Sequence, residues 1–180
     1  MANIKIVSQK IISRSKLFDV LKTKLELSNG SKRSYESIKV RSDVFIFPLL
    51  NKDEIYLIDQ YRYLQKGRVL QAVAGFVEDK ETSVQAAKRE LKEETGLTAF
   101  NFEELLRVEL ANSVVKSLSY LFLAKDLEEG EQSLTESEDI KLVKISLADA
   151  IKKIFSGEII DAKTIVGLFL LDKLKREKKL

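Results

Sequence analysis

Apolar residues alternate with polar ones along the front of the chain, and this pattern predicts strands. Residues 4–12, 17–27 and 34–40 carry alternating and β-branched patterns, and Asn29-Gly30 is a tight-turn signal between the last two segments. The section over residues 1–42 has few large apolar residues for its length. We therefore expect these N-terminal strands to pack against the main domain or against another subunit.

A nearly continuous apolar run over residues 43–50 predicts a strand buried on both faces, in which Pro48 demotes the final residues. Other apolar or alternating segments predict strands over residues 54–61, 68–74, 100–112, 117–125 and 140–145. Helices are expected from Ser146 to Gly157 and from Asp161 to the C-terminus. Because strands outnumber helices and do not alternate strictly with them, we expect an α/β (α+β) fold with a mixed sheet over residues 43–180.

One further helix is predicted between Thr82 and Gly96. Thr82 with Gln85 forms a capping box, and glycine tolerates the left-handed conformation that ends helices. Apolar residues recur at helical spacing between these ends and predict a stripe that faces the core. The stripe consists of Val84, Ala87 and Leu91.

Three acidic residues of this helix lie close together beside the apolar stripe. Glu90, Glu93 and Glu94 are three and four residues apart, so they project within one quadrant of the helix. Like charges at this spacing repel one another unless something positive neutralises them. A bound divalent cation is the simplest candidate.

Composition narrows the kind of cation. The chain of 180 residues contains no cysteine and no histidine, which excludes thiolate and imidazole ligands and also a cysteine nucleophile or a histidine base. A metal site must then consist of oxygen ligands, which favours Mg²⁺, Mn²⁺ or Ca²⁺. With 44% apolar and 33% charged residues we expect a globular protein, and the length suits one domain with a proper core and is short for two.

Charge and hydropathy bear on partners and location. The net charge is only +3, and the basic run Lys173–Lys179 is typical of a solvated helix end, so we expect no nucleic-acid partner. The apolar runs at 44–50 and 165–171 are too short to cross a bilayer, so we expect no membrane partner. The first ten residues lack the apolar stretch of a signal peptide, and we expect a cytoplasmic protein.

The stretch from Gly75 to Leu97 resembles the Nudix box, G-x5-E-x7-R-E-U-x-E-E-x-G-U, where U is aliphatic. All nine specified positions match: Gly75, Glu81, Arg89, Glu90, Leu91, Glu93, Glu94, Gly96 and Leu97. The resemblance implies an α/β/α sandwich and hydrolysis of a phosphoanhydride bond in a nucleoside diphosphate derivative. It also implies a divalent cation, Mg²⁺ with Mn²⁺ as a substitute.

The resemblance implies roles for individual residues of the box. The metal ligands would be Glu90 and Glu94, then Glu93, with the backbone carbonyl of Ala74 as a fourth. Glu93 and Arg89 also belong to the implied catalytic set. We expect Arg89 to pair with a neighbouring carboxylate, Glu81 being the candidate, rather than with substrate.

Segments outside the box resemble the ADP-ribose pyrophosphatase branch of this family. They are Gln60–Tyr63, Ala72–Gly75 and Ser156–Thr164. This resemblance implies that Arg62 grips phosphate, that Arg41 and Gln71 also contact substrate, and that a loop glutamate is the catalytic base. Glu136 is the first candidate for the base and Glu138 the second. It further implies a homodimer whose N-terminal strands contribute to the partner's substrate pocket.

Two departures from that branch leave the substrate open. Position 71 is Gln where the branch commonly has Glu, and Asn112–Ser117 lacks the Pro-Gly and acidic residues typical of ADP-ribose hydrolases. Other nucleotide sugars, a dinucleoside polyphosphate and an oxidised nucleotide are therefore alternatives to ADP-ribose. A Nudix-fold binding module without catalysis is a third possibility, against which the complete acidic set argues.

Overall fold

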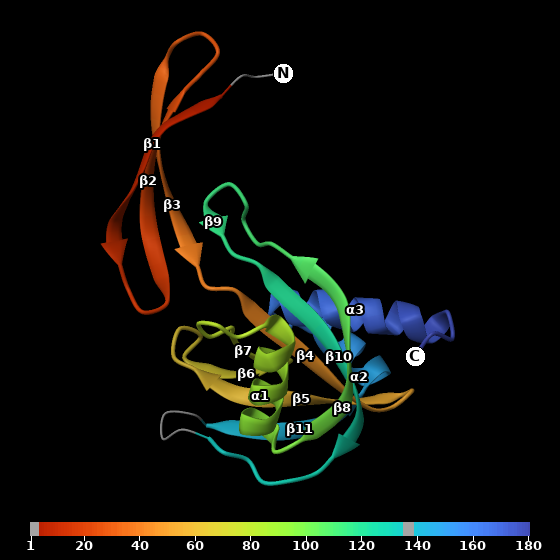
Figure 1. Cartoon of the computed structure of the whole chain (residues 1–180). Coiled ribbons are helices and arrows are strands. Elements are labelled where there is room, and N and C mark those ends of the chain that lie inside the picture. The colour runs from red at the N-terminus through yellow and green to blue at the C-terminus, as the bar shows by residue number, and fades with distance from the viewer. Residues whose placement is uncertain (1–3, 135–138) are drawn as a thin grey trace. The chain divides into compact units, whose positions relative to one another are not determined.

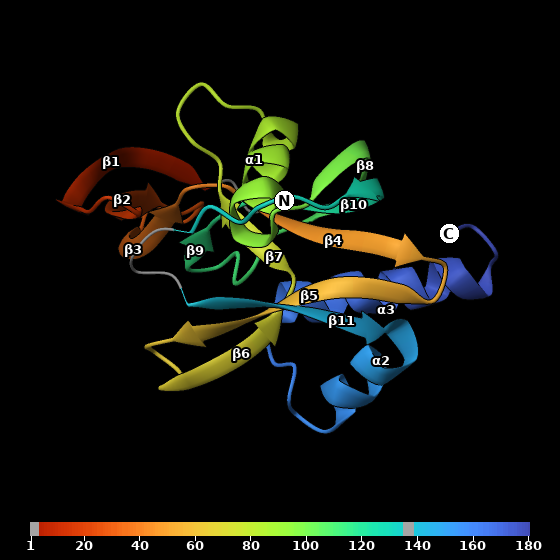
Figure 2. The same cartoon turned by 90° about the horizontal axis from the view of Figure 1, so that it is seen from below.

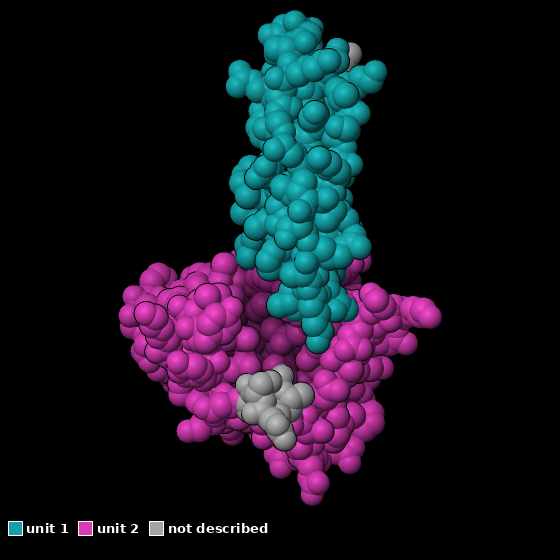
Figure 3. Space-filling model, turned by 90° about the vertical axis from the view of Figure 1, so that its left-hand side faces the viewer, with its two compact units in different colours: residues 1–42, 109–118 teal, residues 43–108, 119–180 magenta. Residues whose placement is uncertain are grey.

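The computed structural model describes residues 4–134 and 139–180. The chain divides into two compact units, distinguished by colour in Figure 3. Unit 1 comprises Met1–Ser42 and Glu109–Leu118, and unit 2 comprises Asp43–Val108 and Ser119–Leu180. The assignment of residues 1–42 and 43–180 as functional domains stays a prediction.

Figure 1 labels the elements in chain order. The strands are β1 (Lys5–Arg14), β2 (Phe18–Glu26), β3 (Lys32–Val40), β4 (Asp43–Asn51), β5 (Glu54–Arg62), β6 (Gly67–Gln71), β7 (Val73–Phe76), β8 (Thr98–Val108), β9 (Val115–Lys116), β10 (Ser119–Glu128) and β11 (Ile140–Ser146). The helices are α1 (Ser83–Thr95), α2 (Leu147–Phe155) and α3 (Ala162–Arg176). None of the helices in the described part of the chain has the length and apolar character to cross a membrane.

Unit 1 is a sheet with the strand order β1-β2-β3-β9. The β1–β2 and β2–β3 pairs are antiparallel, and β9 pairs with β3 in parallel. Within residues 4–42 and 109–118, no side chain is buried. The hydrogen bonds between its strands and the contacts between partly exposed side chains therefore stabilise the sheet of this unit.

Unit 2 is built on a mixed sheet with the order β11-β5-β4-β10-β8, to which β6 adds on β5 and β7 on β4. Strands β4 and β10 are parallel, while the other pairs are antiparallel. Helix α1 covers one face of this sheet, and α2 and α3 cover the other (Figure 2). This arrangement confirms the predicted mixed sheet with helices on both sides.

The central strand β4 shows why both faces carry helices. Its side chains alternate, so Val44 and Ile46 join the core under α1, whereas Phe45 and Phe47 join the core under α2 and α3. All four are at most 6% exposed. The continuous apolar run predicted a strand buried on both faces, and the structure confirms it.

The structure corrects the segment predicted as one strand over residues 68–74. It is divided into β6, which pairs with β5, and β7, which pairs with β4. Pro48 does not end β4 either. On one edge, β4 pairs with β7 up to Ile46 and with β5 from Leu49, so the proline falls where the strand changes partner.

Helix α1 has the predicted ends. The Thr82 hydroxyl accepts from the Gln85 N–H, the Gln85 side chain accepts from the Thr82 N–H, and Gly96 takes the left-handed conformation with φ 76°. The predicted stripe was wrong at Val84, which is 37% exposed. Ala86 is buried instead, because the core under α1 lies slightly to that side of the helix.

Candidate active site

Two glutamates of α1 meet the backbone of β7. The Ala74 N–H donates to Glu94 Oε2 over 3.1 Å, and Glu94 is only 4% exposed. At Gly75 an added Cβ would stand 2.0 Å from Glu90 Cδ. A glycine is therefore required at this position so that the Glu90 carboxylate can lie against the strand.

Arg89 binds the carboxylates around it. Its guanidinium donates to both oxygens of Glu81, each over 3.0 Å, and to Glu90 Oε1 over 2.7 Å. It also donates to Glu93 Oε2 over 3.1 Å and to the Phe76 carbonyl over 3.0 Å. The hydrogen bonds to Glu81, and then the hydrogen bond to Glu90 and its charge, raise the pKa of Arg89. The predicted pairing of Arg89 with Glu81 is confirmed.

The acidic side chains provide part of a metal shell. Glu90 and Glu94 contact adjacent residues of β7, whereas Glu93 is 47% exposed and shares Arg89 with Glu90. Among the residues that the structure describes, no three acidic side chains form a ready-made metal centre. Mg²⁺ typically takes one or two carboxylates and completes its shell with water and substrate phosphates, so these residues fit such an ion.

Two of the predicted substrate-binding residues lie together on β5 and β6. Arg62 Nε donates to Gln71 Oε1 over 3.3 Å, and Gln71 is buried. Gln71 lies opposite Ile58 in the β5–β6 ladder, and Ile58 belongs to the core under α1. The side chain of Gln71 therefore lies on the sheet face that α1 covers. Arg41 belongs to unit 1, where its N–H donates to the Leu17 carbonyl over 3.4 Å.

The loop after β10 contacts the last turn of α1. Gln132 Nε2 donates to the Glu94 carbonyl over 2.6 Å, and the Ser133 N–H donates to the Glu93 carbonyl over 3.0 Å. The last carbonyls of a helix need hydrogen-bond donors, but the sequence of the helix does not say which residues supply them. Both candidate bases, Glu136 and Glu138, lie outside the described residues.

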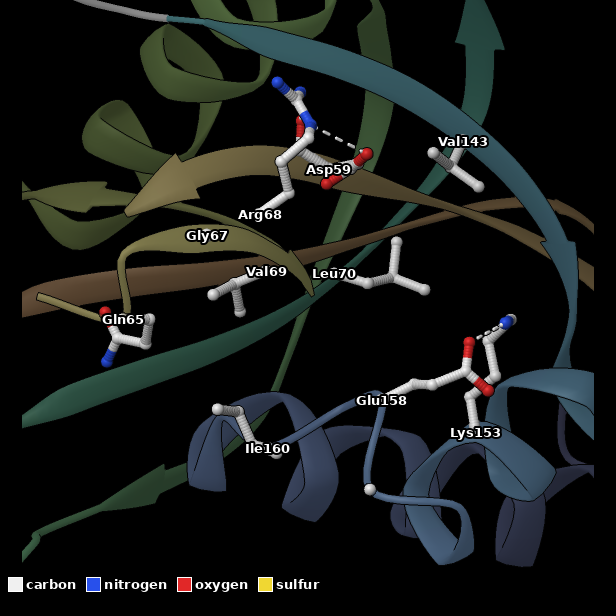
Figure 4. A pocket seen from close by; sticks show the side chains of 11 residues that line it. Asp59, Gln65, Gly67, Arg68, Val69, Leu70, Val143, Lys153, Glu158 and Ile160 are labelled. Carbon is white, nitrogen blue, oxygen red and sulfur yellow. Dashed lines mark hydrogen bonds and ion pairs between the residues drawn. The ribbon is translucent and has the colours of Figure 1, made fainter. Parts of the chain in front are cut away.

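A cavity of about 580 Å³ lies elsewhere in unit 2 (Figure 4). Residues of β5, β6, β11, α2 and the connections β5–β6 and α2–α3 line it. Its charged side chains neutralise one another, since Arg68 Nε lies 2.9 Å from Asp59 Oδ2 and Lys153 pairs with Glu158. Leu70, which pairs with Asp59, packs against the core under α2 and α3, so the cavity lies on the sheet face opposite α1.

Comparison with known proteins identifies the family of this chain. A family model described as NUDIX domain matches residues 39–165. The chain therefore belongs to the NUDIX domain family. Its enzyme class is that of a hydrolase acting on pyrophosphate bonds.

Individual relatives match over nearly the whole chain. The ADP-ribose pyrophosphatase of Bacillus subtilis (strain 168) is 28% identical over 166 residues, which are 91% of this chain and 90% of that protein. The ADP compounds hydrolase NudE of Escherichia coli (strain K12) is 30% identical over 168 residues, which are 92% and 90% of the two chains. A crystal structure of an ADP compounds hydrolase superposes with a TM-score of 0.86 at 29% identity and covers 98% of this chain and 97% of that chain.

Proposed function

We propose that this protein cleaves the phosphoanhydride bond of ADP-ribose or a related nucleotide sugar and releases a nucleoside monophosphate and a sugar phosphate. The observation that carries the proposal is the pair of carboxylates, Glu90 and Glu94, held against Ala74 and Gly75 within a complete Nudix box. The relatives named for ADP-ribose and ADP compounds support this substrate class.

Mg²⁺, with Mn²⁺ as a substitute, is the proposed cofactor. Glu90 and Glu94 would hold it, with Glu93 and the Ala74 carbonyl as further ligands. The bound cation would neutralise the diphosphate and lower the pKa of the attacking water. Arg89 keeps Glu90 and Glu93 oriented through its hydrogen bonds.

The remaining roles belong to residues around the two carboxylates. Arg62 presents its guanidinium to a phosphate, and Gln71 orients Arg62 through the hydrogen bond at Nε. Arg41 is proposed as a further substrate contact. Glu136 or Glu138 would accept the proton of the water that attacks phosphorus.

A panel of diphosphates tests the reaction and the substrate together. ADP-ribose, other nucleotide sugars, dinucleoside polyphosphates and oxidised nucleotides are each incubated with Mg²⁺ or Mn²⁺, and the products are resolved by mass. We expect AMP and ribose 5-phosphate from ADP-ribose. A preferred dinucleoside polyphosphate or oxidised nucleotide would establish the alternative substrate, and ligand binding without any cleavage would establish a binding module.

Glu94→Gln tests the metal role directly. Losing a ligand charge worth roughly 3 kcal/mol in the transition state lowers kcat about hundredfold. The matched control is Glu103→Gln, an exposed strand residue paired with Lys125 at 2.9 Å, which should keep the wild-type kcat. Full Mg²⁺-dependent turnover by Glu94→Gln would disprove the assigned role.

A homodimer and a cytoplasmic location complete the proposal. Large apolar side chains of unit 1 are exposed, among them Ile6 at 62% and Ile11 at 42%, and a second copy of the chain would cover them. Ile6→Glu with Ile11→Glu should yield monomers in light scattering, whereas Ser8→Glu with Ser13→Glu on the same strand should leave dimers. A monomeric wild type at micromolar concentration would contradict the dimer, and cell fractionation tests the location.

A further inference from the structure

Ala72 occupies the junction between β6 and β7. The ladder of β6 with β5 ends with Gln71 opposite Ile58, and the ladder of β7 with β4 begins with Val73 opposite Ile46. In the registers of the described strands, Ala72 belongs to neither ladder, and it is completely buried. A buried backbone N–H needs an acceptor from elsewhere.

Thr164, in the first turn of α3, supplies that acceptor. The Ala72 N–H donates to Thr164 Oγ1 over 3.0 Å, and Thr164 is 0% exposed. The Thr164 hydroxyl itself donates to Asp161 Oδ1 over 2.7 Å, and Asp161 caps α3. Because the hydroxyl hydrogen is directed to Asp161, a lone pair of Oγ1 faces the Ala72 N–H.

The strand that starts after this junction carries the backbone of the candidate active site. Ala74 follows Ala72 by two residues, about 7 Å along a strand. Its N–H holds Glu94, and the next residue, Gly75, lies against Glu90. The place of β7 relative to α1 therefore depends on its ladder with β4 and on what fixes the chain just before the strand.

The same turn of α3 also contacts β4, opposite the other end of β7. Lys163 Nζ pairs with Asp43 Oδ2 and lies 4.6 Å from the centre of the Phe45 ring. Asp43 is the residue of β4 that pairs with Phe76, the last residue of β7. The start of α3 therefore contacts the residue just before β7, and it also contacts the residue of β4 that pairs with the last residue of β7.

We propose that Thr164 is a positioning residue for the candidate active site. Its hydroxyl fixes the β6–β7 junction and thereby sets where Ala74 and Gly75 stand relative to Glu94 and Glu90. The inference deepens the proposed function, on which it rests. A valine at 164 keeps the shape but cannot accept, so a buried N–H loses its partner and the junction shifts.

Thr164→Val is the test variant, and Thr164→Ser restores the acceptor. Since displacements of about 1 Å at an active site cost up to about hundredfold in rate, we expect Thr164→Val to lower kcat at least tenfold with KM changed less than about twofold. Mn²⁺ affinity, measured by electron paramagnetic resonance without substrate, should fall about tenfold. Thr164→Ser should lie within about twofold of wild type in all three quantities.

The control separates positioning from loss of stability. Leu171→Ala removes a fully buried side chain from the same helix and should lower the thermal midpoint at least as much as Thr164→Val. We expect it to keep kcat and Mn²⁺ affinity below its unfolding range. Equal losses of kcat in both variants, or wild-type values in a folded Thr164→Val, would overturn the proposal.

Amide exchange decides the same question without turnover. In the wild type, the Ala72 amide should exchange as slowly as the amides of β4, and in Thr164→Val its rate relative to β4 should rise at least tenfold. A fast Ala72 amide in the wild type would overturn the proposal even if Thr164→Val fails to fold. If no diphosphate is cleaved by the wild type, the proposed function fails, while exchange and Mn²⁺ binding still decide the role of Thr164.

Discussion

The two units of the chain bury their side chains very differently. In unit 2, the alternating residues of β4 enter two cores, one under α1 and one under α2 and α3. In the described part of unit 1, every side chain is at least partly exposed, and ten large apolar side chains are more than a third exposed. Strand patterns occur in both units, so a strand pattern alone does not tell whether a sheet carries a core. What distinguishes the units is the presence of helices to cover the sheet.

A side-chain truncation in the core of unit 2 should lower the stability of the protein most. Ile46 is 0% exposed and packs under α1, so Ile46→Ala should lower the free energy of unfolding by about 2–5 kcal/mol. Urea denaturation followed by circular dichroism measures it. A loss below about 1 kcal/mol would mean that the face under α1 is not the tight core described above.

The two units should also differ in the rates at which their backbone amides exchange hydrogen. Because unit 1 has no buried side chain in its described residues, β1–β3 should open locally and exchange at least about hundredfold faster than β4 and β10, a difference of roughly 2.7 kcal/mol. Mass spectrometry of deuterated peptides measures the rates. Raising the protein concentration should slow amide exchange in unit 1 alone if a second copy covers it. Equal protection of the two units at high dilution would show that they do not differ in local stability.

Overpacking unit 2 should have a smaller effect. A Cβ added at Gly167 of α3 would stand 2.0 Å from the tip of the buried Phe47 ring. The ring or the helix must move, so we expect Gly167→Ala to cost about 1–3 kcal/mol. Its midpoint in urea is compared with that of Val166→Ala on the exposed side of the same helix, which should change much less.

The smallest effect is expected for an isoleucine of unit 1. Ile6 is 62% exposed, and Ile6→Ala in the monomer should change the free energy of unfolding by less than about 0.5 kcal/mol. It is the counterpart of Ile46→Ala, with the same residue type in a strand. A loss as large as that of Ile46→Ala at high dilution would show that unit 1 has a core of its own.

Much of the fold and of the site could be predicted from local patterns. The capping box at Thr82, the stop at Gly96 and the apolar run of β4 are confirmed, because caps and periodicity depend on neighbours in sequence. The division of residues 68–74 into β6 and β7 could not be predicted. It depends on the two different strands with which β6 and β7 pair, and the Ala72 N–H between them finds its acceptor in Thr164, 92 residues away.

The family and the reaction class were already indicated by the amino-acid sequence, through the resemblance of Gly75–Leu97 to the Nudix box. The grouping of Glu90, Glu93 and Glu94 on one side of a helix also follows from the sequence, because it depends only on helical geometry. The sequence also indicated that Arg89 would pair with Glu81. The folded structure was needed to show that Glu90 and Glu94 lie against Ala74 and Gly75, and that Thr164 of α3 accepts a hydrogen bond from Ala72, just before the strand that carries them. The reason is physical: such contacts join segments far apart along the chain, and their geometry depends on how the sheet and its helices pack.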